Sequence, residues 1–143
     1  MERARFPVAA HVFFLRHGAV LLLRRHGTGF FDGSYGLPSG HLEGGEPVAA
    51  AAARECREEV GVEVAPADLR PVGVVHYTSP EGEGVDFFFV ATRWTGEPTP
   101  CAECDEVRWC ALDALPADTI PFVRRAIERH VGAGEWFDQD GWA

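Results

Sequence analysis

The chain has 143 residues, of which 46% are hydrophobic and 24% are charged. This length suits one domain with one hydrophobic core, and the composition excludes an intrinsically disordered chain. Acidic residues outnumber basic ones 22 to 13, for a formal net charge of -9, so no nucleic acid polymer is expected as a partner. We therefore expect a single domain over residues 1–143.

No segment has the pattern of a membrane span or a signal peptide. The longest apolar stretches, near Val8 to Leu15 and Ala19 to Leu23, are too short to cross a bilayer. No cleavable pattern follows the charged N-terminus, Met1 to Arg5. We expect a cytoplasmic protein with no membrane partner.

Four cysteines occur, at Cys56, Cys101, Cys104 and Cys110. Cys101 and Cys104 have the two-residue spacing of zinc and redox sites. A zinc site would need a second ligand pair, and a thioredoxin-like motif would need to open a helix, whereas these two precede a predicted strand. Free thiols are therefore expected.

The first two predicted elements form an antiparallel hairpin. Residues Phe6 to Leu15 and Ala19 to Arg24 are rich in Val, Phe and Leu, and a turn at His17-Gly18 joins them. A glycine-rich loop follows and runs to Glu46-Pro47. Such a loop before a helix suits close contact with a ligand.

A helix is predicted from Pro47 to Val60, since Pro47 fits a first helical turn and Gly61 suits a left-handed stop. Later strands are predicted at Val72–Tyr77, Val85–Trp94 and Glu106–Leu112, and a second helix at Pro121–Val131. The tail carries Trp136, Phe137 and Trp142, so we expect it to pack on the domain or on a second subunit, which leaves a homodimer open.

The first predicted helix has two distinct faces. At about 100° per residue, an apolar stripe suited to packing on a sheet is formed by Ala49, Ala53, Cys56 and Val60. Well away from it, Glu55, Glu58 and Glu59 share one face and repel one another. Oxygen ligands grouped in this way are what Mg²⁺ or Mn²⁺ requires, although a solvated acidic face is the plain alternative.

The spacing upstream of these acids favours a metal site over a solvated acidic face. The stretch from Gly40 to Glu46, seven further residues and then Arg54-Glu55-Cys56-Arg57-Glu58-Glu59-Val60-Gly61-Val62 resembles the full signature of the Nudix hydrolase family. Every fixed position is occupied, and the one mild departure is Cys56, where a larger aliphatic residue is more usual. The resemblance implies an α/β fold of the Nudix type, an α/β/α sandwich with a central mixed β-sheet.

The resemblance also assigns roles to residues of the signature. It implies that Glu55, Glu58 and Glu59 hold Mg²⁺, or Mn²⁺, together with a backbone carbonyl at or near Gly40. Arg54 would then hold the carboxylates in place, and Glu46 would anchor the start of the helix. For the base that activates water we favour Glu55 or Glu58.

The roles of residues outside the signature have alternatives. A further acid is expected among Glu103, Asp105 and Glu106, which otherwise form a solvated strand edge. Phosphate oxygens could contact Arg24 and Arg25, for which surface ion pairs are the alternative. A base could stack on Phe30, Phe31 or Tyr35, and a pocket could open near His76 and Tyr77, with core packing as the alternative for each.

The function that this pattern favours is metal-dependent hydrolysis of a phosphoanhydride bond in a small nucleotide. The substrate could be a nucleoside diphosphate or triphosphate, or a nucleoside diphosphate linked to another group. The alternative from another class is a catalytically silent nucleotide-binding sensor. Such sensors usually lose signature acids, whereas all of them are present here.

Overall fold

The computed structural model describes all residues, Met1 to Ala143. It consists of a mixed β-sheet between two helices. Its strands are β1 (Val8–Arg16), β2 (Ala19–Arg25), β3 (Tyr35–Gly36), β4 (Ser39–His41), β5 (Arg70–Ser79), β6 (Gly82–Ala91), β7 (Cys104–Ala111) and β8 (Phe137–Asp140). Its helical segments are α1 (Val48–Val60), the 3₁₀ turn η1 (Pro66–Asp68), α2 (Pro121–Ala126) and the π-helical η2 (Ile127–Gly132).

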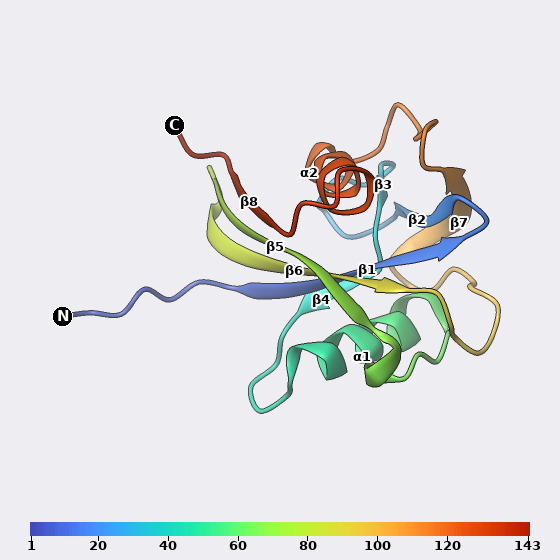
Figure 1. The fold of residues 1–143 in the computed structure, drawn as a ribbon, viewed down its shortest axis with the longest axis horizontal. Coiled ribbons are helices and arrows are strands. Elements are labelled where there is room, and N and C mark those ends of the chain that lie inside the picture. Colours follow the sequence, from blue (N-terminus) through green and yellow to red (C-terminus); the bar gives the residue numbers. More distant parts are fainter.

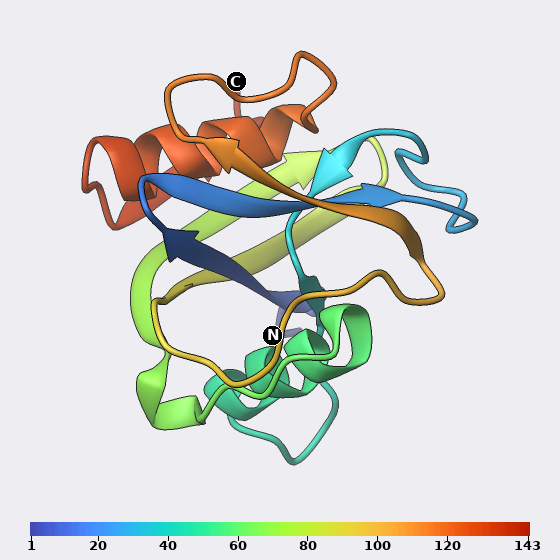
Figure 2. The ribbon, with the colours of Figure 1, turned by 90° about the vertical axis from the view of Figure 1, so that its right-hand side faces the viewer.

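The strand order is β3-β2-β1-β6-β5-β8, with β4 beside β1 and β7 beside β2. Strand β1 pairs parallel to β6, whereas β5 pairs antiparallel to β6 and parallel to β8. Helices α1 and α2 cover opposite faces of this sheet (Figures 1 and 2). The predicted α/β/α sandwich with a central mixed sheet is confirmed.

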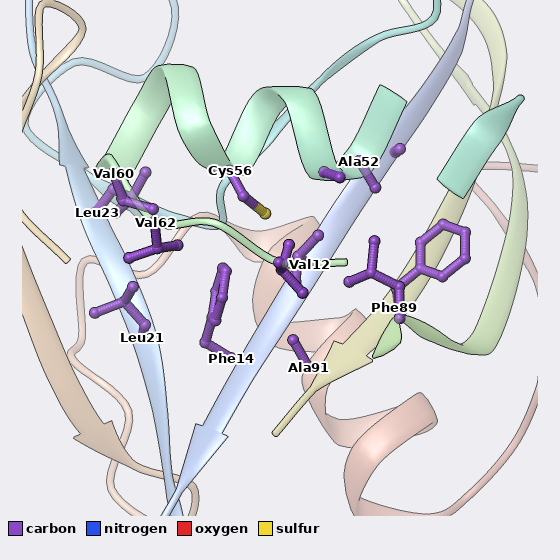
Figure 3. Close-up of a cluster of buried hydrophobic side chains, with 14 of the residues drawn as sticks. Val12, Phe14, Leu21, Leu23, Ala52, Cys56, Val60, Val62, Phe89 and Ala91 are labelled. Carbon is purple, nitrogen blue, oxygen red and sulfur yellow. The ribbon is translucent and has the colours of Figure 1, made fainter. Parts of the chain in front are cut away.

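Strand β1 is the centre of the core because it contributes to both faces. Its side chains alternate in direction, so Val12 and Phe14 lie under α1 while Phe13 lies under α2. Figure 3 shows the cluster under α1, with the side chain of Cys56 pointing from the helix toward the strands. A strand buried on both faces explains the apolar run that the sequence shows here, which only His11 interrupts.

Helix α1 lies with the predicted stripe toward the sheet. Ala53, Cys56 and Val60 are buried, and Ala49 is partly buried against the same cluster. The helix begins at Val48, one residue later than predicted, because the preceding proline has extended backbone geometry. It ends as predicted at Gly61, whose left-handed conformation lets its N–H donate to the Arg57 carbonyl.

Several predicted strand boundaries were wrong because they depend on which strands pair in the sheet. Strands β1 and β2 pair only at Leu15–Val20 and Arg16–Ala19, because Ala9 to His11 on that edge of β1 pair with β4 instead. Strand β6 begins and ends three residues earlier than predicted because a tight turn after Ser79 folds it directly back on β5. The short strands β3 and β4 lie within the predicted glycine-rich loop.

The second helix does not keep one geometry. It is α-helical only through Ala126 and then widens, so that the Ala133 N–H donates to the carbonyl of Glu128, five residues back. After it the tail returns as β8, and the Trp142 indole N–H donates to the His76 carbonyl at 2.9 Å. The tail therefore packs on its own domain, which is one of the two predicted alternatives, the other being a second subunit.

All four cysteines are free thiols, as predicted. None of the helices has both the length and the apolar character that crossing a membrane requires.

Candidate active site

Strand β4 brings the backbone of Ser39 and Gly40 against the acidic face of α1. The Ser39 N–H donates to Glu59 Oε2 at 2.9 Å. Gly40 lies so close to the Glu55 carboxylate that no Cβ atom fits between them. A glycine is therefore required at position 40, because a side chain there would displace Glu55.

Arg54 connects the loop before α1 with the acids on the helix. Its guanidinium donates to both oxygens of Glu46, at 2.8 and 3.2 Å, and to Glu55 at 2.8 Å. A longer contact of 3.3 Å reaches Glu58, one helical turn away. These bonds hold the pKa of Glu46 below its usual value and bring Arg54 into contact with Glu46, Glu55 and Glu58.

The three acids of α1 differ in burial. Glu58 is the most accessible, with 55% of its side chain exposed, whereas the Glu55 side chain is 13% exposed. Burial raises the pKa of Glu55, and it raises the pKa of Glu59 to about 8. Glu59 faces the backbone of β4 rather than a fully solvated surface.

The carboxylates of Glu55, Glu58 and Glu59 do not converge on one point in the structure. No group of three or more His, Cys, Asp or Glu side chains has the arrangement of a metal site. The reason is in the hydrogen bonds, because Arg54 engages Glu55 and Glu58 while the Ser39 N–H engages Glu59.

Of the three acids considered near β7, one joins this cluster. Glu103 lines the same cavity as Glu59, and its negative charge contributes to the raised pKa of both Glu55 and Glu59. Asp105 and Glu106 instead bind Arg24, at 2.7 and 3.3 Å. The ion-pair alternative therefore holds for Arg24, which does not line the cavity that Glu59 and Glu103 line.

A cavity of about 730 Å³ opens beside these acids. One end is lined by Arg25, Ser39, Gly40, Glu59 and Glu103. The rest passes over the sheet to α2 and is mainly apolar, with lining residues that include Val75, Tyr77, Phe88, Ile120 and Phe122. Its volume lies in the range of sites that hold small organic ligands.

Two polar residues in this cavity were not among the sequence candidates. His11 and Asp86 are buried, and His11 Nε2 lies 3.1 Å from Asp86 Oδ1. The contact lacks hydrogen-bond geometry, so His11 Nε2 has no partner in the protein. His11 stacks on Phe88, with 4.6 Å between ring centroids. The signal for them was a polar residue interrupting an apolar strand.

The aromatic residues of the glycine-rich loop divide between cavity and core. Phe30 and Phe31 are exposed at the cavity rim, and the Arg25 Nε–H donates to the Phe30 carbonyl at 2.6 Å. Tyr35 is buried and its hydroxyl donates to Glu106, so core packing holds for Tyr35 rather than stacking on a ligand. Of the later pair only Tyr77 lines the cavity, while His76 contacts Glu83.

Comparison with known proteins agrees with this geometry. The NUDIX domain model matches residues 4–130. The chain belongs to the Nudix family. A crystal structure of a MutT NUDIX hydrolase from Burkholderia pseudomallei superposes with a TM-score of 0.78 at 28% identity, covering 85% of this chain and 95% of that one.

Two Nudix relatives have assigned activities. The NAD-capped RNA hydrolase NudC of Pseudomonas aeruginosa is 37% identical over 121 residues, which is 84% of this chain but 40% of NudC. The 8-oxo-dGTP diphosphatase of Haemophilus influenzae is 30% identical over 128 residues, covering 85% and 87%. The chain thus spans about two fifths of the length of NudC. The names support the expected hydrolase class, and because one of them includes RNA, the exclusion of nucleic acid polymers stays a prediction.

Proposed function

We propose that the chain is a divalent-metal-dependent pyrophosphohydrolase that cleaves a phosphoanhydride bond in a nucleoside diphosphate or triphosphate, or in a related nucleotide. The observation that carries the proposal is the position of Glu55 and Glu59 against Ser39 and Gly40 at one end of the cavity. That end suits phosphates and a cation, and the apolar remainder suits the organic part of a nucleotide.

The residues present fit a hard cation such as Mg²⁺, with Mn²⁺ as its substitute. Carboxylate oxygens are the preferred ligands of both ions, and α1 offers Glu55, Glu58 and Glu59. Burial raises the pKa values of Glu55 and Glu59, and a bound cation would favour their charged forms. When bound, a divalent cation neutralises charge on phosphate oxygens and makes a coordinated water more acidic.

Glu103 is the acid we assign to the attacking water. It is exposed and lines the cavity, whereas Glu55 and Glu58, the bases favoured from the sequence, accept hydrogen bonds from Arg54. The water oxygen attacks phosphorus as the bridging P–O bond breaks, and the water proton passes to Glu103. The hydrogen bond from Arg54 opposes the effect of burial on the Glu55 pKa.

Arg25 is the residue we assign to the phosphate chain. It lines the cavity, and only its Nε–H is engaged, by the Phe30 carbonyl. A guanidinium has further N–H groups in a planar fork that matches phosphate oxygens. The Phe30 ring, 5.6 Å from the Arg25 guanidinium carbon, lies where a base or sugar could contact it.

The cavity also holds His11, opposite Ser39 on the neighbouring strand, and Asp86 on β6, and we assign both to recognition of the base. A buried carboxylate is costly unless it accepts hydrogen bonds, and His11 Nε2 does not supply one here. A ring that presents N–H donors supplies them, as the amino and imino groups of a purine do. The small-molecule nucleotide is thus the proposed partner of this site.

The test is hydrolysis of a panel with Mg²⁺. The panel contains canonical and oxidised nucleoside triphosphates, nucleoside diphosphates, ADP-ribose, nucleotide sugars, dinucleoside polyphosphates and a 5′-capped RNA oligonucleotide. We expect release of phosphate or pyrophosphate, or of a nucleoside monophosphate, from one class of small nucleotide. No turnover of any compound by a folded chain would instead favour the silent sensor, and turnover of the RNA alone would overturn the exclusion of polymers.

A further inference from the structure

Cys101 and Cys104 lie at the two ends of a tight turn just before β7. The Cys104 N–H donates to the Cys101 carbonyl at 3.2 Å, which closes the turn. The first and fourth residues of such a turn have Cα atoms within about 7 Å of each other. Disulfides form between cysteines at about 4.4–6.8 Å, so this backbone is already in the range that a disulfide requires.

Both thiols point at one atom of the metal-binding helix. The Cys101 thiol donates to the Glu59 carbonyl oxygen at 2.6 Å, and the Cys104 sulfur lies 3.8 Å from the same oxygen. The Cys101 N–H also donates to the Cys104 sulfur at 3.5 Å. The two sulfur atoms are therefore neighbours, with Cys101 partly exposed to solvent and Cys104 buried.

The turn closes the C-terminal end of α1. Carbonyls in the last turn of a helix have no partner within the helix, and here the Thr99 N–H donates to the Val60 carbonyl while Cys101 donates to that of Glu59. Glu59 extends its carboxylate into the cavity, and Glu103 lies between the two cysteines. One short turn thus contacts the backbone of Glu59 and carries Glu103, two acids that line the same cavity.

We propose that Cys101 and Cys104 form a redox clasp, an oxidisable pair that controls this end of the site. A low-molecular-weight disulfide is the oxidant: each thiol loses one hydrogen, a bond forms between the two sulfurs, and the oxidant's S–S bond breaks to give two thiols. Oxidation removes the Cys101 S–H donor from the Glu59 carbonyl and draws the turn that carries Glu103 together. Reduction restores both.

The consequence for metal binding follows from this contact. Groups that orient metal ligands without touching the metal typically change metal affinity about 10- to 100-fold when they are removed. We expect oxidation to weaken Mn²⁺ binding by roughly 10-fold. The effect on turnover rests on the proposed function, whereas disulfide formation and Mn²⁺ affinity do not.

The experiment compares the reduced chain with the chain treated with oxidised glutathione. Peptide mapping locates any disulfide, Mn²⁺ binding is followed by electron paramagnetic resonance, and turnover is measured on the best compound of the panel. Cys101→Ser keeps a donor to the Glu59 carbonyl but cannot form the bond, so it should bind Mn²⁺ like the reduced parent and ignore the oxidant. Cys110→Ser, away from the clasp, should remain sensitive.

A Cys101–Cys104 disulfide with weaker Mn²⁺ binding, reversed by dithiothreitol, is the expected result. The proposal is overturned if no such disulfide forms, if it forms between other cysteines, or if it forms and leaves Mn²⁺ affinity unchanged. Should Cys101→Ser fail to fold, Cys104→Ser gives the same comparison. If the parent hydrolyses nothing, the Mn²⁺ measurement still decides the clasp, so its failure is distinct from that of the proposed function.

Discussion

The carboxylate of Glu55 occupies the space that a Cβ atom at Gly40 would need. This contact joins β4 to α1 beside the cavity that Gly40 lines. The proposed chemistry depends on it, because it fixes where Glu55 presents its oxygens.

Gly40→Ala should therefore lower turnover by at least about 10-fold, since the added methyl displaces Glu55 from its ligand position. Mn²⁺ affinity should fall with it. Gly44→Ala is the matched control, because a Cβ at Gly44 in the same loop meets no atom within 4 Å. Equal losses in the two variants would mean that the loop backbone, and not the contact with Glu55, is responsible.

Glu59→Gln should lower turnover by orders of magnitude without unfolding the chain. The amide keeps an oxygen that can accept from the Ser39 N–H but has no charge to offer a cation. Glu63→Gln on the exposed surface is the control. Activity is measured beside thermal melting, and near-parental turnover in Glu59→Gln would reject the metal assignment.

The metal-free chain should lose stability as pH rises from about 4.5 to about 8. Over this window the folded state holds a proton on Glu59, whose pKa burial raises to about 8, while the unfolded chain releases it near 4.5. The unfolded state therefore binds fewer protons, so the free energy of unfolding falls with pH, by a few kcal/mol at most.

Melting temperatures in chelator across this pH range measure the effect. Glu59→Gln should flatten the curve, because the amide does not titrate, and Mg²⁺ should restore the parent at the alkaline end. A parent whose melting temperature is constant or rises between these limits would show that Glu59 does not retain its proton.

Asp86→Ala should raise KM for the best nucleotide by about 10- to 150-fold and leave kcat within about 2-fold, because it removes a recognition contact worth about 1.5–3 kcal/mol and touches no reacting atom. Asp113→Asn, an exposed acid outside the cavity, should change neither constant. A fall in kcat with unchanged KM would contradict the assignment of Asp86 to base recognition.

Ala53→Asp should prevent stable folding, because it places a charge where α1 packs on the sheet. An unpaired charge at a buried position costs about 3 kcal/mol or more, a large share of the stability of a small domain. Circular dichroism and melting temperature test this. A soluble Ala53→Asp variant that melts like the parent would mean that α1 does not pack as described.

Helix α1 and its acidic face could be predicted because their information is local. The spacing of Glu55 and Glu59, and Gly61 after them, determine a face and an end within one turn or two. Strand β8 could not be predicted in this way, since its four residues are stabilised by pairing with β5, far away in the sequence. Tertiary pairing overrides weak local preference in such short segments.

The same reason explains which site residues were missed. His11 and Asp86 come together only because β1 and β6 pair in parallel, with Ala9 opposite Asp86 and His11 opposite Phe88. Among the acids near β7, the choice of Glu103 depends on the turn closed by Cys101 and Cys104, since the next two acids face Arg24. Neither relationship has a spacing signal in the sequence.

The measurement that tests the central claim most directly is turnover of the best nucleotide while Mg²⁺ is titrated into chelator-treated protein. The account predicts no turnover in excess chelator, recovery as Mg²⁺ is added and no recovery at any Mg²⁺ concentration in Glu59→Gln. Hydrolysis at the same rate in excess chelator, by parent and variant alike, would contradict a metal-dependent mechanism at this site.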